Sequence, residues 1–232
     1  MSGNILIIGG NSGIGLELVK KLNKSGYNLT VASRSNSNLS EFDNLEYREF
    51  DASDPNFEMP SIPEQLEGLV YLPGTINLKP FNRIKEKDFE DDWRINFLGA
   101  VKVIQHALPS LKKGTHPSIV LISTVAVQSG LAFHTSISAA KGAIEGFVRA
   151  LAAELAPTIR VNAIAPSLTD TPLAERLLNS ESKVDSSSDR HPLKRVGRPV
   201  DQANAISYLL SDESSWITGQ ILHVDGGLSV IR

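Results

Sequence analysis

A glycine-rich turn between a short apolar run and an amphipathic segment is the feature that most constrains how this chain folds. Residues 4–10, NILIIGG, have the pattern of a buried strand that ends in glycines. Residues 16–27 carry apolar side chains at helical spacing, with Gly26 as a stop signal. Residues 28–34 predict a second strand. Strand, turn, helix and strand form a βαβ unit, and in open parallel sheets dinucleotides bind at the carboxyl end of the first strand.

The turn itself, GGNSGIG, has glycines where a bound pyrophosphate requires them. Gly9 lets the chain turn tightly. Gly13 and Gly15 allow the backbone to approach the anion and the strand closely, at a helix N-terminus that favours negative charge. The alternative is a simple strand-to-helix turn without a ligand. We expect cofactor contacts from the turn residues Gly9, Asn11, Ser12, Gly13, Ile14 and Gly15.

The end of the second strand indicates which cofactor is bound. A unit that prefers NAD usually places an acid about 20 residues beyond the glycines, on the ribose 2′-hydroxyl. Here Ser33 and Arg34 stand in that place. A carboxylate repels a 2′-phosphate, whereas a serine and an arginine accept one, so NADP is favoured over NAD. The alternative is that Arg34 is only a solvated surface residue.

Strand and helix patterns alternate along the rest of the chain. This alternation predicts a doubly wound, Rossmann-type α/β fold with a parallel sheet and helices on both faces, in one domain over residues 1–232. The proline-rich residues 52–68 leave room only for short helical pieces, and the serine-rich residues 181–190 predict a mobile loop. Further strands are expected at 45–51, 69–75, 117–124, 158–166 and 219–227, and further helices at 86–114, 137–156, 171–180 and 200–212.

Composition excludes several classes of partner. Among 232 residues, 21% are charged and the formal net charge is −3, which gives no electrostatic reason to expect nucleic acid or an anionic membrane. The chain has no cysteine, so disulfides and thiolate chemistry are excluded, and we expect no metal site. No apolar stretch is long enough to span a membrane, and the N-terminus lacks the pattern of a secretory signal. We therefore expect a cytoplasmic protein.

Several motifs, in order, resemble the short-chain dehydrogenase/reductase family over nearly the full length. They are the glycine turn, with Ile8 where the family usually has threonine, 95-INFLGA-100, 160-RVNAIAP-166 and the segment 193–227. The resemblance implies about seven parallel strands and a homodimer or homotetramer. It also implies a nicotinamide cofactor and a small-molecule substrate. The residues it assigns are Asn96 as the catalytic asparagine, Asp51 on the adenine, and Gly74, Pro166 and Thr171 around the cofactor.

The active-site helix departs from the family pattern. Family members carry a serine, then thirteen positions on a tyrosine, then four positions on a lysine. Counting back from Lys141 puts Ile137 at the tyrosine position and Thr124 at the serine position. Threonine still offers a hydroxyl, but isoleucine cannot transfer a proton. The motif NNAG is here YLPG at 71–74, and the glycine after Pro166 is Ser167, so the pocket is expected to be reshaped.

Two residues are candidates to supply the missing proton. His134 lies seven positions before Lys141, a spacing that resembles the enoyl-reductase branch of the family; the alternative is a loop histidine without a role. Lys141 itself could act through Thr124 or a water, although its main expected role is to hold the ribose. The predicted function is NADPH-dependent reduction of a carbonyl compound. The alternatives are an enoyl-type C=C reductase and a non-catalytic NADP-binding relative.

Overall fold

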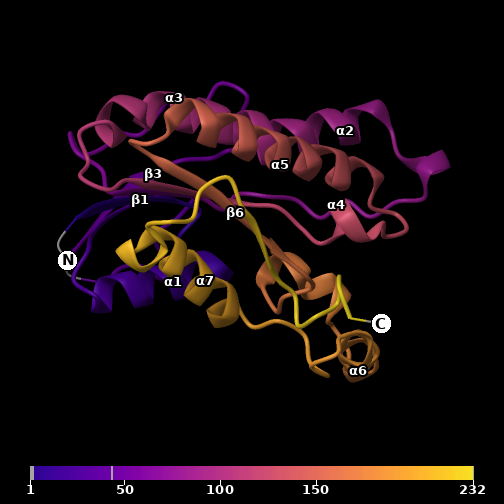
Figure 1. Cartoon of the computed structure of the whole chain (residues 1–232). Coiled ribbons are helices and arrows are strands. Elements are labelled where there is room, and N and C mark those ends of the chain that lie inside the picture. The colour runs from indigo at the N-terminus through magenta and orange to yellow at the C-terminus, as the bar shows by residue number, and fades with distance from the viewer. Residues whose placement is uncertain (1–2, 43, 232) are drawn as a thin grey trace.

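A central strand, β1 (Asn4–Ile8), organises the sheet and leads directly into the glycine turn. It pairs in parallel with β2 on one side and β4 on the other, so that Ile5 lies opposite both Leu29 and Gly68. The computed structural model describes residues 3–42 and 44–231. Its seven strands follow the order β3-β2-β1-β4-β5-β6-β7, all parallel, which confirms the predicted sheet (Figure 1). The other strands are β2 (Asn28–Ser33), β3 (Leu45–Glu49), β4 (Gly68–Tyr71), β5 (Ser118–Ile122), β6 (Arg160–Pro166) and β7 (Ile221–Val224).

Helices cover both faces of the sheet, as predicted. In Figure 1, α2, α3 and α5 lie on one face and α1 and α7 on the other. Each face has its own apolar core, and Leu69 and Leu121 contribute to one whereas Val70 and Val120 contribute to the other. This alternation is expected of strands buried on both sides. The helices are α1 (Gly13–Lys24), α2 (Glu86–Trp93), α3 (Gly99–Leu111), α4 (Ala126–Ser129), α5 (Thr135–Leu155), α6 (Glu181–Arg190) and α7 (Pro199–Leu210), with short turns η1 (Phe81–Arg83), η2 (Arg94–Leu98), η3 (Pro172–Leu177) and η4 (Asp212–Ser214).

The strand order reverses beside β1, and this reversal positions the site. The chain leaves β1 toward β2 on one side and later returns to β4 on the other. Loops that leave the carboxyl ends of the two neighbouring strands therefore diverge and open a crevice, the usual ligand position in such sheets. The turn after β1 lies at this crevice.

The prediction of a mobile loop at residues 181–190 was wrong: these residues form α6. The Ser180 side chain accepts a hydrogen bond from the Lys183 amide, Glu181 lies in the first turn and Arg190 in the last. Capping and favourable end charges outweigh the poor helix propensity of the serines. Within the described chain, residues 52–67 contain turns but no helix.

The predicted long helix over 86–114 is divided in two by η2, a π-helical turn. The Gly99 amide donates to the Arg94 carbonyl, five residues back. Such insertions are frequently found at functional sites, and this one holds Asn96. Across the part of the chain that the structure describes, no helix combines the length and hydrophobicity needed to cross a bilayer.

Candidate active site

The turn after β1 has the backbone geometry that an anion site needs. Gly9 and Gly13 have positive φ angles of 86° and 51°. A Cβ atom on Gly15 would lie 2.2 Å from the Gly9 carbonyl oxygen, so α1 begins against the turn only because this residue is glycine. Ser12 is the N-cap of α1, and the first turn carries no acidic residue. The unpaired amides of this helix end fit a pyrophosphate.

The loop after β6 crosses the carboxyl edge of the sheet and reaches the glycine turn. A Cβ atom on Gly13 would lie 3.2 Å from Cγ2 of Thr171, so these two predicted cofactor residues are neighbours. The Pro166 carbonyl accepts a hydrogen bond from the Val125 amide at 3.1 Å, which ties the ends of β5 and β6 together. Residues from three strand ends therefore surround the crevice.

Asn11 joins the glycine turn to the loop after β2. Its Nδ2 donates to the Ser35 hydroxyl at 2.8 Å, and its Oδ1 accepts from the Asn38 amide at 3.0 Å. Ile14 instead packs against the core on the α1 side of the sheet. Asn11 thus orders the segment beside the proposed ribose, whereas Ile14 contributes packing.

Ser33 and Arg34 are placed differently from each other. Ser33 is buried, and its hydroxyl donates to the Ser35 carbonyl at 2.8 Å. Arg34 is exposed and lines a hollow of about 420 Å³ together with Asp51. Hydrogen bonds from the Ser53 hydroxyl and amide, helped by the charge of Arg34, hold the pKa of Asp51 below its usual value against the opposing effect of burial. The hollow is also lined by Glu49, Phe50, Asp54, Phe57 and Glu58.

Lys141 is the buried cation of the site. It lies on α5 with 7% of its surface exposed, and Nζ donates to the Ile122 carbonyl at 2.8 Å. A Cβ atom on Gly74 would lie 3.6 Å from this Nζ and 3.0 Å from Oδ1 of Asn96. The structure therefore brings Gly74, Asn96 and Lys141 together. Burial lowers the pKa of Lys141 to about 8, and the charge of Asp92 partly offsets this effect.

Asn96 is buried in the π-helical turn, and Tyr71 contacts the backbone of that turn at the preceding residue. Tyr71 donates its hydroxyl to the Ile95 carbonyl at 2.7 Å. A Cβ atom on Gly99 would lie 2.2 Å from that hydroxyl, so glycine is needed for this contact. Burial raises the pKa of Tyr71. A buried phenol that is bound to a carbonyl supports the turn and is unsuited to proton transfer.

The remaining candidate residues, Ile137, Thr124 and His134, lie at or near the start of α5. Ile137 is buried, with 6% of its surface exposed. Thr124 accepts a hydrogen bond from the Ala126 amide at 3.3 Å, and Ser138 donates to the Ala126 carbonyl at 3.2 Å. His134 is the N-cap of α5, and its Nδ1 lies 2.7 Å from the Ala132 carbonyl oxygen. Among the described residues no hydrogen bond links His134 to Lys141 or Thr124.

One buried acid near the lysine was not among the residues predicted for the site. Asp92 is fully buried on α2 and accepts hydrogen bonds from the side chains of Thr75 and Asn77. Asp92 and Asn96 are four residues apart, a spacing that places both on one helix face. That spacing was a usable signal in the sequence.

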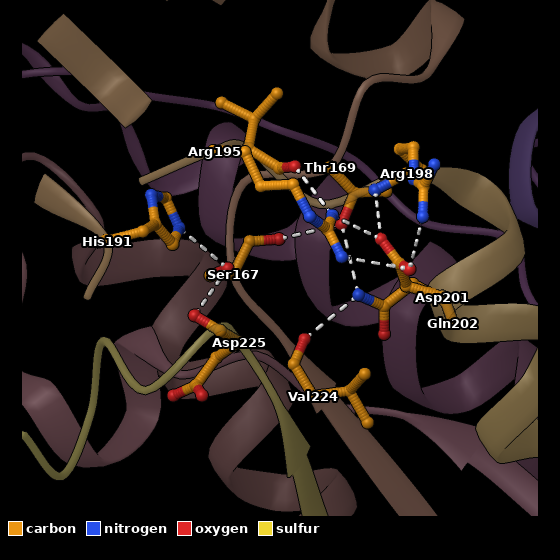
Figure 2. Close-up of polar contacts among 10 residues, drawn as sticks. Ser167, Thr169, His191, Arg195, Arg198, Asp201, Gln202, Val224 and Asp225 are labelled. Carbon is orange, nitrogen blue, oxygen red and sulfur yellow. Dashed lines mark hydrogen bonds and ion pairs between the residues drawn. The ribbon is translucent and has the colours of Figure 1, made fainter. Parts of the chain in front are cut away.

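The contact between Ser167 and His191 was not predicted from the sequence either. The Ser167 hydroxyl lies 2.9 Å from Nε2 of His191, a buried residue at the end of α6, and 3.3 Å from the Asp225 carbonyl oxygen (Figure 2). Figure 2 also shows that Nε2 of Gln202 donates to the hydroxyl of Thr169, another residue of this loop. The loop after β6 is therefore held by the side chains of His191 at the end of α6 and Gln202 on α7, and by the Asp225 carbonyl after β7.

Comparisons with known proteins agree with this geometry. A family model described as enoyl-(acyl carrier protein) reductase matches residues 8–229. A tropinone reductase homolog from Datura stramonium is 31% identical over 244 residues, covering 97% of this chain and 91% of that protein. Ligand-free aldohexose dehydrogenase from Thermoplasma acidophilum superposes with a TM-score of 0.89 at 25% identity, over 100% of this chain and 95% of that one. NADP-bound ElxO superposes with a TM-score of 0.86 at 27% identity, over 98% of this chain and 99% of that one.

The sheet order, the glycine turn and the buried lysine define an α/β oxidoreductase that uses a nicotinamide cofactor. The chain belongs to the short-chain dehydrogenase/reductase family.

Proposed function

We propose that this protein is an NADPH-dependent reductase of a carbonyl compound whose active site works without the family's tyrosine. The observation that carries the proposal is Lys141, a buried ammonium beside Asn96 and Gly74 with a pKa of about 8. A group that titrates near neutral pH is suited to acid–base catalysis. Thr124, Lys141, Asn96 and His134 are the proposed active-site residues.

When bound, the cofactor supplies a hydride to the carbonyl carbon, and the oxygen then needs one proton. Ile137 has no proton to give, so in this proposal the Lys141 ammonium gives it through the Thr124 hydroxyl or a water, and the product is the alcohol. Thr124 also positions the carbonyl by donating a hydrogen bond. General acid catalysis contributes about 10² to 10⁴-fold, so an indirect route predicts slow turnover.

Arg34 supports the choice of NADPH. Its guanidinium is exposed at the end of β2, next to the loop that Asn11 organises through Ser35. An exposed arginine with neighbouring hydroxyls suits a 2′-phosphate. Two features oppose this choice: the Ser33 hydroxyl is already bound to a carbonyl, and the hollow beside Arg34 carries four carboxylates. A direct comparison of the two cofactors is therefore the first test.

That test is a fluorescence titration of the wild-type protein and of Arg34→Ala with NADPH and NADH. We expect tighter binding of NADPH to the wild type, and a loss of that preference, but not of NADH binding, in Arg34→Ala. Lys24→Ala, which removes an exposed cation at the far end of α1, is the control. Equal affinities for the two cofactors in the wild type would contradict the 2′-phosphate assignment.

An enoyl-type reductase is the second candidate. The family model that matches residues 8–229 carries that description, and His134 lies near the start of the active-site helix. A non-catalytic NADP-binding role is the third, and the buried Ile137 at the tyrosine position favours it. A screen of ketones and enoyl thioesters that follows NADPH absorbance separates all three.

Ile137→Tyr is the informative variant in that screen. A sharp rise in ketone reduction indicates a pocket that still binds carbonyls and lacks only the proton donor. If neither the wild type nor Ile137→Tyr reduces any ketone, the carbonyl proposal is contradicted. His134→Ala, in parallel, tests whether His134 supplies the proton: a loss of activity with either substrate class supports that role, and an unchanged rate contradicts it.

We also propose that residues 1–232 form one nucleotide-binding domain that assembles as a homodimer or homotetramer. Large apolar side chains are exposed near the C-terminus, namely Trp216, Val230 and Ile231. Such residues suit burial between subunits. Light scattering after size-exclusion chromatography measures the assembly, and a monomer at micromolar concentration would contradict it.

A further inference from the structure

A continuous polar network begins at Asp92 on α2. Its side chain is fully buried, and Oδ1 accepts hydrogen bonds from the Thr75 hydroxyl and from Nδ2 of Asn77, the latter at 2.8 Å. Both donors are neutral. A buried carboxylate is costly unless hydrogen bonds and an opposite charge compensate for the lost water. The two neutral donors therefore leave Asp92 in need of a cation.

Thr75 carries the network toward the lysine. Its hydroxyl oxygen accepts from Nδ2 of Asn96 at 2.8 Å, and the same Nδ2 lies 2.9 Å from the Asp92 backbone carbonyl. The amide nitrogen of Asn96 thus uses its two protons for Thr75 and for the Asp92 backbone. The Oδ1 atom of Asn96 faces Gly74, and Nζ of Lys141 lies close to the same glycine.

The remaining hydrogen-bonding capacity of these groups is complementary. Within residues 3–42 and 44–231, Oδ2 of Asp92 and Oδ1 of Asn96 are buried acceptors without a partner. The Lys141 ammonium has three protons, and the Ile122 carbonyl takes one. The site therefore contains two buried acceptors without a partner, on Asp92 and Asn96, and a buried ammonium, on Lys141, with protons left to donate.

Several other charges on α2 and α5 are already engaged. Asp88 pairs with Lys79, Asp91 pairs with Lys87 and Arg94, and the buried Glu145, one turn beyond Lys141 on α5, accepts from Ser123 and Gln128. Asp92 is the one charge identified as acting on the pKa of Lys141, which it raises while burial lowers it.

We propose that Asp92 is a positioning residue of this active site: with Thr75 and Asn96 it forms a buried network that keeps Lys141 in its ammonium form, ready to give a proton. The catalytic part of this inference rests on the proposed reductase function, whereas the electrostatic part does not. In a site without a tyrosine, the charge state of the lysine decides whether a proton is present at all.

The inference predicts how the lysine titrates. Asp92→Asn removes the negative charge that raises the pKa of Lys141. Burial then lowers this pKa without an opposing effect, so Lys141 loses its proton at a lower pH. An opposite charge nearby typically shifts a pKa by about one unit or more. We therefore expect the pKa of Lys141 to fall by about one unit in Asp92→Asn.

The experiment is a pH titration of the full chain carrying ¹³C-labelled lysine, followed by NMR, with the Lys141 signal assigned from Lys141→Met. Asp91→Asn is the matched control, since it removes the same charge one residue away, where the carboxylate pairs with Lys87 and Arg94. Asp92→Glu retains the charge and is expected to titrate close to wild type. If Asp92→Asn does not fold, Asp92→Ser removes the charge with a smaller side chain.

A downward shift in Asp92→Asn with no comparable shift in Asp91→Asn supports the network. An unchanged Lys141 titration in Asp92→Asn, or equal shifts in both variants, overturns it. The titration requires neither substrate nor turnover, so failure of the reductase assay leaves this result intact. With an active enzyme, the rate of Asp92→Asn is expected to fall off about one pH unit earlier on the alkaline side.

Discussion

The Ser167 hydroxyl lies 2.9 Å from Nε2 of His191, and Nδ1 of the same imidazole lies 2.7 Å from the Ser187 carbonyl oxygen. A carbonyl only accepts, so Nδ1 carries a proton, and Nε2 is the ring nitrogen that faces the Ser167 hydroxyl. One buried imidazole thus joins the loop after β6 to α6 (Figure 2). Because α6 contributes no buried residue of its own, this link is a main attachment of the helix.

His191→Ala is expected to loosen α6. The substitution removes two hydrogen bonds, each of which contributes about 1 kcal/mol. Hydrogen–deuterium exchange of residues 181–190 should become faster while exchange in β1 stays unchanged. His116→Ala, at an exposed imidazole beside Asp212, is the control. Unaltered protection of α6 would show that other contacts hold it.

Ser180→Ala tests why residues 181–190 are helical. The Ser180 side chain caps the Lys183 amide, and loss of such a cap costs about 1 kcal/mol. Exchange in the first turn of α6 is expected to accelerate most. Ser186→Ala, at an exposed position within the helix, should instead slow exchange, because alanine is the better helix former. The same effect from both substitutions would contradict a capping role.

Lys141→Met is expected to change how stability depends on pH. The unfolded lysine keeps its ordinary pKa of 10.5, whereas the folded value is about 8, so between these values unfolding takes up a proton. Wild-type stability should therefore rise by about 3 kcal/mol relative to Lys141→Met as the pH goes from 8 to 10.5. Below pH 8 the cost of burying the ammonium is present in full. Urea denaturation at several pH values measures the difference, and a constant difference would contradict a buried, shifted lysine.

Gly15→Ala is expected to abolish dinucleotide binding. The added Cβ would meet the Gly9 carbonyl oxygen at 2.2 Å, so α1 has to move away from the turn. Gly146→Ala in α5 is the matched control: its Cβ would find no atom within 4 Å, and alanine should stabilise the helix by about 1 kcal/mol. Cofactor fluorescence and thermal unfolding follow both variants. Normal NADPH binding by Gly15→Ala would contradict a pyrophosphate site at the glycine turn.

Much of the fold was predictable because it is encoded in short segments. The apolar strands, the glycines at positions 9, 13 and 15 and the helix after them each carry a local signal, and parallel pairing follows from their alternation. The π-helical turn at Asn96 was not predictable in this way. It is contacted by Tyr71, which reaches the Ile95 carbonyl from the end of β4, far away in the sequence.

The class of protein follows directly from the order of residues along the chain, and the prediction that Ile137 stands at the tyrosine position also comes from that order. The environment of Lys141 does not, because it is made by side chains from separate elements. Asp92 on α2, Thr75 after β4 and Asn96 in η2 meet only when the sheet and helices pack. Charge interactions depend on distance and burial, which residue order leaves open until the chain is folded. Packing therefore decides that Lys141 is buried and that the charge of Asp92 acts on it.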